Sequence, residues 1–285
     1  MRQRAFLVLV LGAILIGVVP IGVRLCEMHP LAVGFWRFAL ALPVLYWWSR
    51  SLARATVPTR RRRLLILTGL LFACDIGCFF VAIRATSVAN ATLLSNCAPL
   101  FVALGVAATM GGLPSRLAMV GTAIALAGIA LLVGERLESG HVIGDLLGLV
   151  SAVFYGGYQL AVAALRRDQP AVRVMLWVAG VGALALGVVC LVARIPLWPT
   201  RGVDWAILAV LALVTQIGGQ GAITWAMAHL APVFSSVVLL VQPVVAAALA
   251  WALFADGWMG PWQIVGALLV LGGILLARRA QADAS

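Results

Sequence analysis

Charge is scarce in this sequence. Only 10% of its 285 residues are charged, and 64% are hydrophobic. A soluble domain needs more charge than this to cover its surface, so the composition excludes a soluble globular protein and predicts an integral membrane protein. Lysine is absent, and the 20 basic residues are arginines that lie mostly between apolar runs. We therefore expect the net charge of +11 to orient the chain in a lipid bilayer, and we expect no nucleic-acid partner.

Residues with catalytic or metal-binding chemistry are few and scattered. The three histidines lie at the ends of apolar runs, and the chain has no HExxH, GxSxG or nucleotide-binding motif. The five cysteines are an odd number at membrane depth and do not cluster, which argues against a disulfide framework and against a metal site. The sequence thus predicts a protein that is not an enzyme, holds no cofactor or metal and does not use ATP. An intramembrane enzyme and a channel are the alternatives from other classes.

Hydropathy, with breaks at proline, glycine and arginine, predicts ten transmembrane helices of about 20 residues each. The expected spans are residues 5–23, 31–49, 64–83, 88–110, 115–134, 142–165, 171–193, 203–228, 232–254 and 261–277. The first run resembles a signal peptide, but it is long enough to cross a bilayer and no cleavage site follows, so we interpret it as the first helix. The expected fold class is an all-α integral membrane protein.

The distribution of arginine predicts the orientation. With the first residue in the cytoplasm, most of the arginines fall on the cytoplasmic side, the cluster Arg60–Arg63 among them. By the positive-inside rule we expect both termini in the cytoplasm of a bacterium and a multi-pass protein of its cytoplasmic (inner) membrane.

The chain contains an internal duplication. Pro99 recurs 144 residues later as Pro243, and Pro30 recurs 140 residues later as Pro170. Each copy holds five expected spans, and an odd number means that the copies enter the membrane from opposite sides. Inverted repeats of this kind are common in secondary transporters, with the substrate site at the midplane between the halves. The duplication therefore predicts transport by alternating access.

The residues also resemble a known family. The matching features are Phe35-Trp36-Arg37-Phe38, Ala98-Pro99 and the glycine-containing segments 120–128 and 265–273 that close the two halves. The chain is similar to the drug/metabolite transporter superfamily, and within it to ten-helix transporters with two EamA domains. The resemblance implies a first repeat over residues 1–138, a second over 139–285, and transport of small metabolites, in many members export of amino acids. The Trp-Gly pair that such repeats often carry in the first helix is missing here, and so is a mid-helix acid in that span.

Asp75 is the main candidate for substrate binding. A carboxylate near mid-membrane costs about 2.5–3.5 kcal/mol on insertion scales, so it should face protein, water or a ligand. It could bind a substrate ammonium group, carry a proton or form a static hydrogen bond. Cys78 lies one turn further along the same span, and we count it as a candidate although small apolar packing is its simpler role.

The fourth span carries Thr92 and Asn96 before Pro99. Proline lacks an N–H, so it frees a carbonyl about four residues earlier, near Ser95, as a ligand group. We expect Thr92 and Asn96 to bind substrate and Pro99 and Pro243 to act as hinges.

Four further polar residues lie in the second half. Gln216 and Gln220 are one turn apart beside several glycines, and either line a cavity or bond to neighbouring helices. Tyr155 and Gln159 share a helix face that we expect to line the cavity, whereas the neighbouring Tyr158 suits the membrane interface.

Arg37 has three open interpretations: pairing with Asp75, binding a substrate carboxylate, or extending to the outer interface. Together these residues predict a carrier that exports small polar or amphipathic metabolites, amino acids above others, including large or aromatic ones. Export of drugs or other organic solutes is the alternative. The substrate and the lipid bilayer are the expected partners. The oligomeric state stays open, and a monomer is compatible with the sequence.

Overall fold

A computed structural model of the chain describes residues 1–50, 58–86, 88–110, 114–133, 142–254 and 260–283. All regular structure in these residues is helical, which confirms the all-α class. In chain order the helices of the first half are α1 (Arg2–Ile16), α2 (Val19–Leu25), α3 (Pro30–Arg50), α4 (Thr59–Ala85), α5 (Val88–Ser95), α6 (Ala98–Met110) and α7 (Arg116–Val133). Those of the second half are α8 (Val142–Leu165), α9 (Ala171–Val192), α10 (Gly202–Val210), the π-helix η2 (Leu211–Gly219), α11 (Gln220–Ala226), α12 (Pro232–Val238), α13 (Val241–Phe254) and α14 (Pro261–Asp283).

These helices form the expected membrane spans. Within the described residues, nine helical segments are long and apolar enough to cross a bilayer, and α7 is a shorter apolar helix of the same kind. At a rise of about 1.5 Å per residue, the 18 residues of α7 extend about 27 Å, close to the thickness of a hydrocarbon core. Many large apolar side chains remain exposed on the outside of the bundle, as a lipid-facing surface requires.

Four of the spans are not single α-helices. Span 4 breaks between α5 and α6 before Pro99, and span 9 breaks between α12 and α13 before Pro243, as the prolines predict. Two further irregularities were not expected from the sequence. Span 1 breaks between α1 and α2 just before Pro20, and span 8 passes through the nine-residue π-helix η2.

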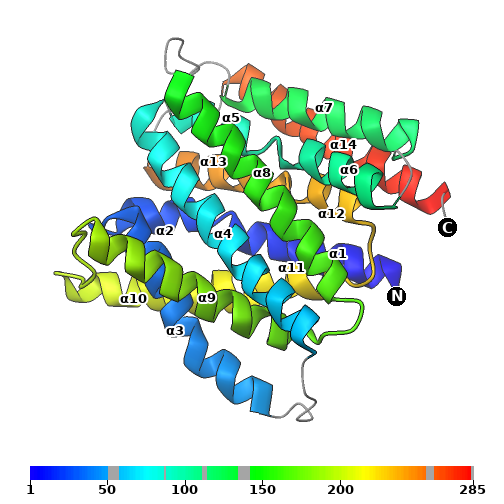
Figure 1. Ribbon diagram of the computed structural model, residues 1–285. Helices are drawn as coiled ribbons and strands as arrows, with labels where there is room; N and C mark the ends of the chain where they lie inside the picture. The colour runs from blue at the N-terminus through cyan, green and yellow to red at the C-terminus, as the bar shows by residue number, and fades with distance from the viewer. Residues whose placement is uncertain (51–57, 87, 111–113, 134–141, 255–259, 284–285) are drawn as a thin grey trace.

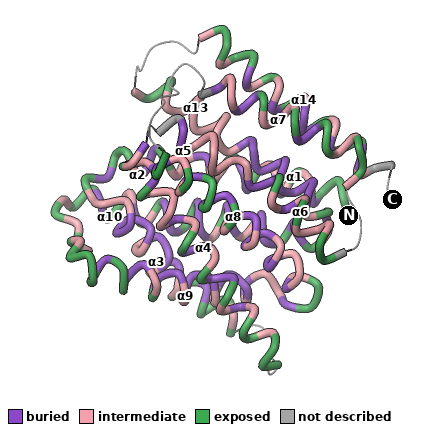
Figure 2. Tube along the Cα trace, turned by 45° about the horizontal axis from the view of Figure 1, so that its top comes forward, coloured by how far each residue is buried: buried purple, intermediate pink, exposed green. Residues whose placement is uncertain are grey.

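The two halves interlock. The first span of each half packs against the third span of the other, since α1 contacts η2 and α11 while α8 contacts α4. The second spans, α3 and α9, pack against each other, and so do the fifth spans, α7 and α14, which lie side by side in Figure 1. Figures 1 and 2 both place the start of α1 and the end of α14 at one end of the bundle, here called the terminal end. The predicted repeat boundary at 138/139 lies outside the described residues.

Candidate functional site

A small cavity lies where the two proline-broken spans meet. Its lining comes from the break of span 4, from the break of span 9, and from α8 between them. The lining residues are Ser95, Asn96, Ala98, Pro99, Tyr155, Gln159, Ser236, Leu239, Leu240 and Gln242. Its volume of about 20 Å³ holds about one water molecule and is far below the roughly 300–1,000 Å³ of an open ligand pocket. In this structure the site is therefore too small to hold a metabolite.

The break in span 4 shapes one side of the cavity. The carbonyl oxygen of Thr92 accepts the Asn96 side-chain amide at 2.8 Å and the Ser95 hydroxyl at 3.1 Å. Because Pro99 has no N–H, the next turn cannot continue the α-helical ladder, and Asn96 and Pro99 face the cavity. Thr92 itself is not among the lining residues; its backbone positions those that are.

The opposite side carries unsatisfied amides. Gln159 is 1% exposed, and neither its amide oxygen nor its amide nitrogen has a hydrogen-bond partner among the described residues. In the same part of the chain, the amide nitrogen of Gln242 also lacks one. Buried polar groups without partners cost about 1–3 kcal/mol each, so a bound water or a polar ligand would stabilise this arrangement. Of the predicted site residues, Asn96, Tyr155, Gln159 and Pro99 thus meet at one cavity.

An aromatic cluster extends from the cavity. Phe72 stacks on Tyr158, with ring centroids 4.5 Å apart, and Tyr155 lies 6.0 Å from Tyr158. Tyr158 is 1% exposed and accepts a hydrogen bond of 2.6 Å from Gln220. The expectation that Tyr158 sits at the membrane interface is therefore wrong, because its ring points inward between α4 and α11. For Gln220, the interpretation as a residue bonded to a neighbouring helix holds.

Arg37 lies against the same cluster. It is 7% exposed, and its guanidinium carbon is 5.6 Å from the Phe72 ring centroid and 5.3 Å from that of Phe38. Extension to the outer interface is therefore wrong, since the side chain is buried among aromatic rings. Its Nε has no hydrogen-bond partner in the described part of the chain, which leaves donor capacity at the centre of the bundle.

Asp75 lies beside the cavity and does not line it. Its carboxylate accepts a hydrogen bond of 2.6 Å from Ser151, a fully buried residue of α8. It attracts Arg37 electrostatically, but among the described residues no direct ion pair joins the two. Cys78, one turn further along α4, is half-buried and outside the cavity lining. Asp75 and Cys78 would contact a ligand only if α4 or α8 moved.

Gln216 occupies the π-helix. It is fully buried, and both of its amide atoms lack partners in the described residues. Pairing with a neighbouring helix, the simpler interpretation, therefore does not hold for Gln216. Single turns of π-helix inside α-helices frequently mark functional sites, because the widened ladder re-aims side chains.

Sequence reasoning missed Ser236 and the leucines of the second break as cavity residues. The 144-residue offset that relates Pro99 to Pro243 also relates Ser95 to Leu239 and Ala98 to Gln242. If the 144-residue offset is applied to every residue around the prolines, it identifies most of the lining residues near the break in span 9.

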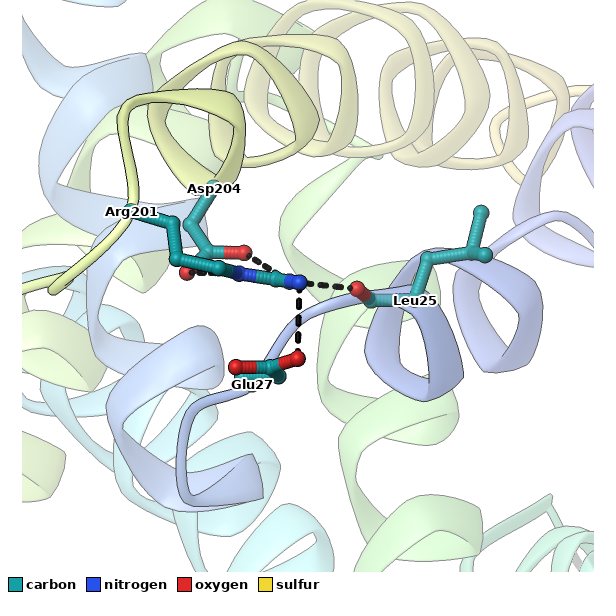
Figure 3. Close-up of polar contacts among 4 residues, drawn as sticks. All are labelled: Leu25, Glu27, Arg201 and Asp204. Atoms are coloured by element: carbon teal, nitrogen blue, oxygen red, sulfur yellow. Dashed lines mark hydrogen bonds and ion pairs between the residues drawn. The ribbon is translucent and has the colours of Figure 1, made fainter.

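Two ion pairs tie the halves together at opposite ends of the bundle. Arg201, before α10, bonds Glu27 at 2.8 Å, Asp204 at 2.7 Å and the Leu25 carbonyl oxygen at 3.0 Å (Figure 3). At the terminal end, Arg61 of α4 pairs with Asp168, after α8, at 2.7 Å. The arginines are 140 residues apart and the acids 141, so the two pairs are counterparts in the repeat.

The contact between Arg201 and Asp204 changes pKa values at this end of the bundle. Its hydrogen bond to Asp204 raises the pKa of the Arg201 guanidinium. Burial, and then the negative charge of Asp204, raise the pKa of the adjacent Cys26 thiol to about 11.

Comparison with known proteins identifies the family. The EamA-like transporter family matches residues 3–134 and 142–279, which together form most of the chain. The chain belongs to the EamA-like transporter family. The two matched ranges are the two halves described above, so this EamA protein is a multi-pass membrane transporter built from two repeats.

Individual relatives agree with the family. The EamA chain is 25% identical over 253 residues to a pseudopaline exporter, CntI, of Pseudomonas aeruginosa, covering 86% of this chain and 82% of that protein. An uncharacterized transporter of Archaeoglobus fulgidus is 32% identical over 148 residues, covering 48% of this chain and 49% of that one. A solved crystal structure matches with a TM-score of 0.83 at 19% identity, covering 98% of this chain and 99% of the other, and supports the fold.

Proposed function

We propose that this EamA transporter exports small polar or amphipathic metabolites, amino acids above others, across the bacterial cytoplasmic membrane by alternating access. The observation that carries this proposal is the polar cavity between the halves, at the meeting point of two broken helices. Transporters with inverted repeats bind their substrates at such a midplane position. One relative in the comparison is itself an exporter, which favours the outward direction.

The groups around the cavity suit a zwitterion. The amide oxygen of Gln159 and the carbonyl oxygens at the helix breaks can accept hydrogen bonds from an ammonium group, and the amide nitrogens of Gln159 and Gln242 can donate to a carboxylate. Arg37 offers a buried positive charge for the carboxylate, and Asp75 a negative charge for the ammonium. Tyr155 and Phe72 provide an aromatic surface for a large side chain.

The cavity is too small for a substrate in the conformation described here. Its present volume admits about one water molecule, so a substrate enters only after the helices separate at one end. Because the two halves are equivalent in topology, opening at either end uses the same set of contacts with the roles of the halves exchanged. Both termini are proposed to lie in the cytoplasm, on the side where the arginine cluster Arg60–Arg63 is found.

Transport assays with purified protein test the proposal. Proteoliposomes are loaded in turn with labelled amino acids and with cationic dyes. Efflux is compared with that from liposomes that carry the same solute but no protein. We expect saturable movement of one or more amino acids, large or aromatic ones included, and competition between them. Saturation at a low rate also separates a carrier from a channel. If dyes move and amino acids do not, the aromatic surface of Tyr155 and Phe72 serves drug-like solutes, and export of organic solutes replaces amino-acid export.

A further inference from the structure

One arginine at the terminal end links two helices that otherwise belong to different packed pairs. Helix α8 packs along α4, where Ser151 bonds Asp75 and Gly144 lies against Thr86. Helix α11 packs on α1, where Gly12 lies against Gly219 and Ile223. Between α8 and α11 themselves, long side chains supply the polar contacts: Tyr158 with Gln220 at mid-membrane, and Arg166 at the terminal end.

The contact of Arg166 is specific. Its Nε donates to the carbonyl oxygen of Thr224 at 3.0 Å, and its Nη1 donates to the carbonyl oxygen of Gln169. The amide of Ala228, which would continue the α-helical pattern at Thr224, bonds Trp225 instead. Arg166 therefore satisfies an open carbonyl at the C-terminal end of α11, where the helix dipole also favours a positive charge.

The position of Arg166 relates it to the cavity. Tyr155, Gln159 and Arg166 are spaced by four and seven residues, so they lie on one face of α8 and its continuation. Arg166 directly follows Leu165, the last residue of α8. Arg166 is about 10 Å from Gln159 along the axis, in the direction of the terminal end. It thus lies on the side of the cavity toward the terminal end.

We propose that Arg166 is the gate at the terminal end: it pins α8 to α11 while the cavity is closed and leaves Thr224 when the cavity opens there. At the other end the 140-residue offset places Cys26 where the second half has Arg166, and the arginine found there, Arg201, bonds a different helix end, the carbonyl oxygen of Leu25. The gate is therefore asymmetric, and its loss favours opening toward the terminal end. This inference rests on the alternating access proposed above.

Accessibility of a cysteine in the cavity tests the gate. Ser236, which lines the cavity, is replaced by cysteine in a chain whose five native cysteines have been removed and whose folding has been verified. Labelling by a membrane-impermeant maleimide is timed in inside-out vesicles and in spheroplasts. In Arg166→Ala we expect labelling from the terminal end to rise roughly tenfold, as expected for the loss of a hydrogen bond to a charged group. Labelling from the opposite side should stay equal or fall.

The neighbouring Arg167 provides a matched control. It is exposed and carries the same charge at the same helix end, so Arg167→Ala should label like the parent. Arg166→Gln, which keeps a shorter donor, should fall between the parent and Arg166→Ala, and it replaces the alanine variant if that variant is not monodisperse. Equal labelling of the Arg166 and Arg167 variants would overturn the gate. A parent chain that labels from neither side would instead overturn alternating access, whatever the variants do.

Discussion

A Cβ atom built on Gly121 would stand 2.7 Å from the carbonyl oxygen of Gly273, and one on Gly128 would stand 2.6 Å from that of Gly266. These two glycine pairs bring the backbones of α7 and α14 into direct contact, so the last spans of the two halves form one tight unit. Small residues are the usual means of close helix packing in membranes, where the hydrophobic effect gives no drive for association.

Gly273→Ala should therefore destabilise the protein. The added methyl group must push α7 away from α14, and overpacking of this kind typically costs about 1–3 kcal/mol. Gly272→Ala is the matched control, since a Cβ at Gly272 meets nothing within 4 Å. We expect thermal unfolding in detergent to occur at a lower temperature for Gly273→Ala and at an unchanged or higher one for Gly272→Ala. Equal midpoints for the two variants would contradict the close packing.

The glycine pairs show what the sequence could predict. Gly121 and Gly128 align with Gly266 and Gly273 in the duplication, and the structure places both pairs at the contact between spans 5 and 10. Periodic features such as apolar length, repeated proline and repeated glycine report on the fold, because each acts through local geometry and recurs in both halves.

Features that depend on the surroundings of a residue could not be predicted in this way. Pro43 lies within α3 without ending it, whereas Pro20 coincides with a break in span 1. The π-helix of span 8 has no sequence signature that separates it from an α-helix. The inward orientation of Tyr158 and the burial of Arg37 depend on which helix lies opposite, and spacing within one span does not contain that information.

The proposed hinge role of Pro99 and Pro243 gives a second prediction. Pro243→Ala restores an N–H that can bond the carbonyl of Leu239, and Pro99→Ala does the same for Ser95, so both breaks should stiffen. We expect a higher unfolding temperature together with a several-fold slower efflux. Pro43→Ala is the control, because this exposed proline lies inside a continuous helix away from the cavity. Unchanged efflux in both hinge variants would show that transport does not bend spans 4 and 9.

Asp75 gives a third prediction, on the driving force. If its carboxylate exchanges a proton for substrate, Asp75→Asn should keep the hydrogen bond with Ser151 but lose the response of efflux to a pH gradient. Ser151→Ala, which removes only the donor, should keep that response. Efflux is compared with and without a gradient in each protein. Equal rates under both conditions in the unaltered protein would remove Asp75 as a coupling site and leave the substrate gradient as the driving force.

The pKa of Cys26 gives a fourth prediction at the opposite end from the termini. Burial and then the charge of Asp204 raise this pKa from 9.0 to about 11. Only the thiolate reacts with iodoacetamide, so at pH 8 about one thiol in a thousand is reactive, and the rate should rise about tenfold per pH unit up to pH 10.

A chain that retains Cys26 as its only cysteine allows this rate to be measured by mass spectrometry. Asp204→Asn removes the neighbouring negative charge, so the pKa of Cys26 should fall and alkylation at pH 8 should become faster. In urea-unfolded protein, the midpoint of the pH dependence of alkylation should return to near 9. Because Asp204 is bound to Arg201, which also pairs with Glu27, the shift reports whether this contact between the halves is closed. A folded-state midpoint near 9 would mean that water reaches Cys26 and that the halves separate there.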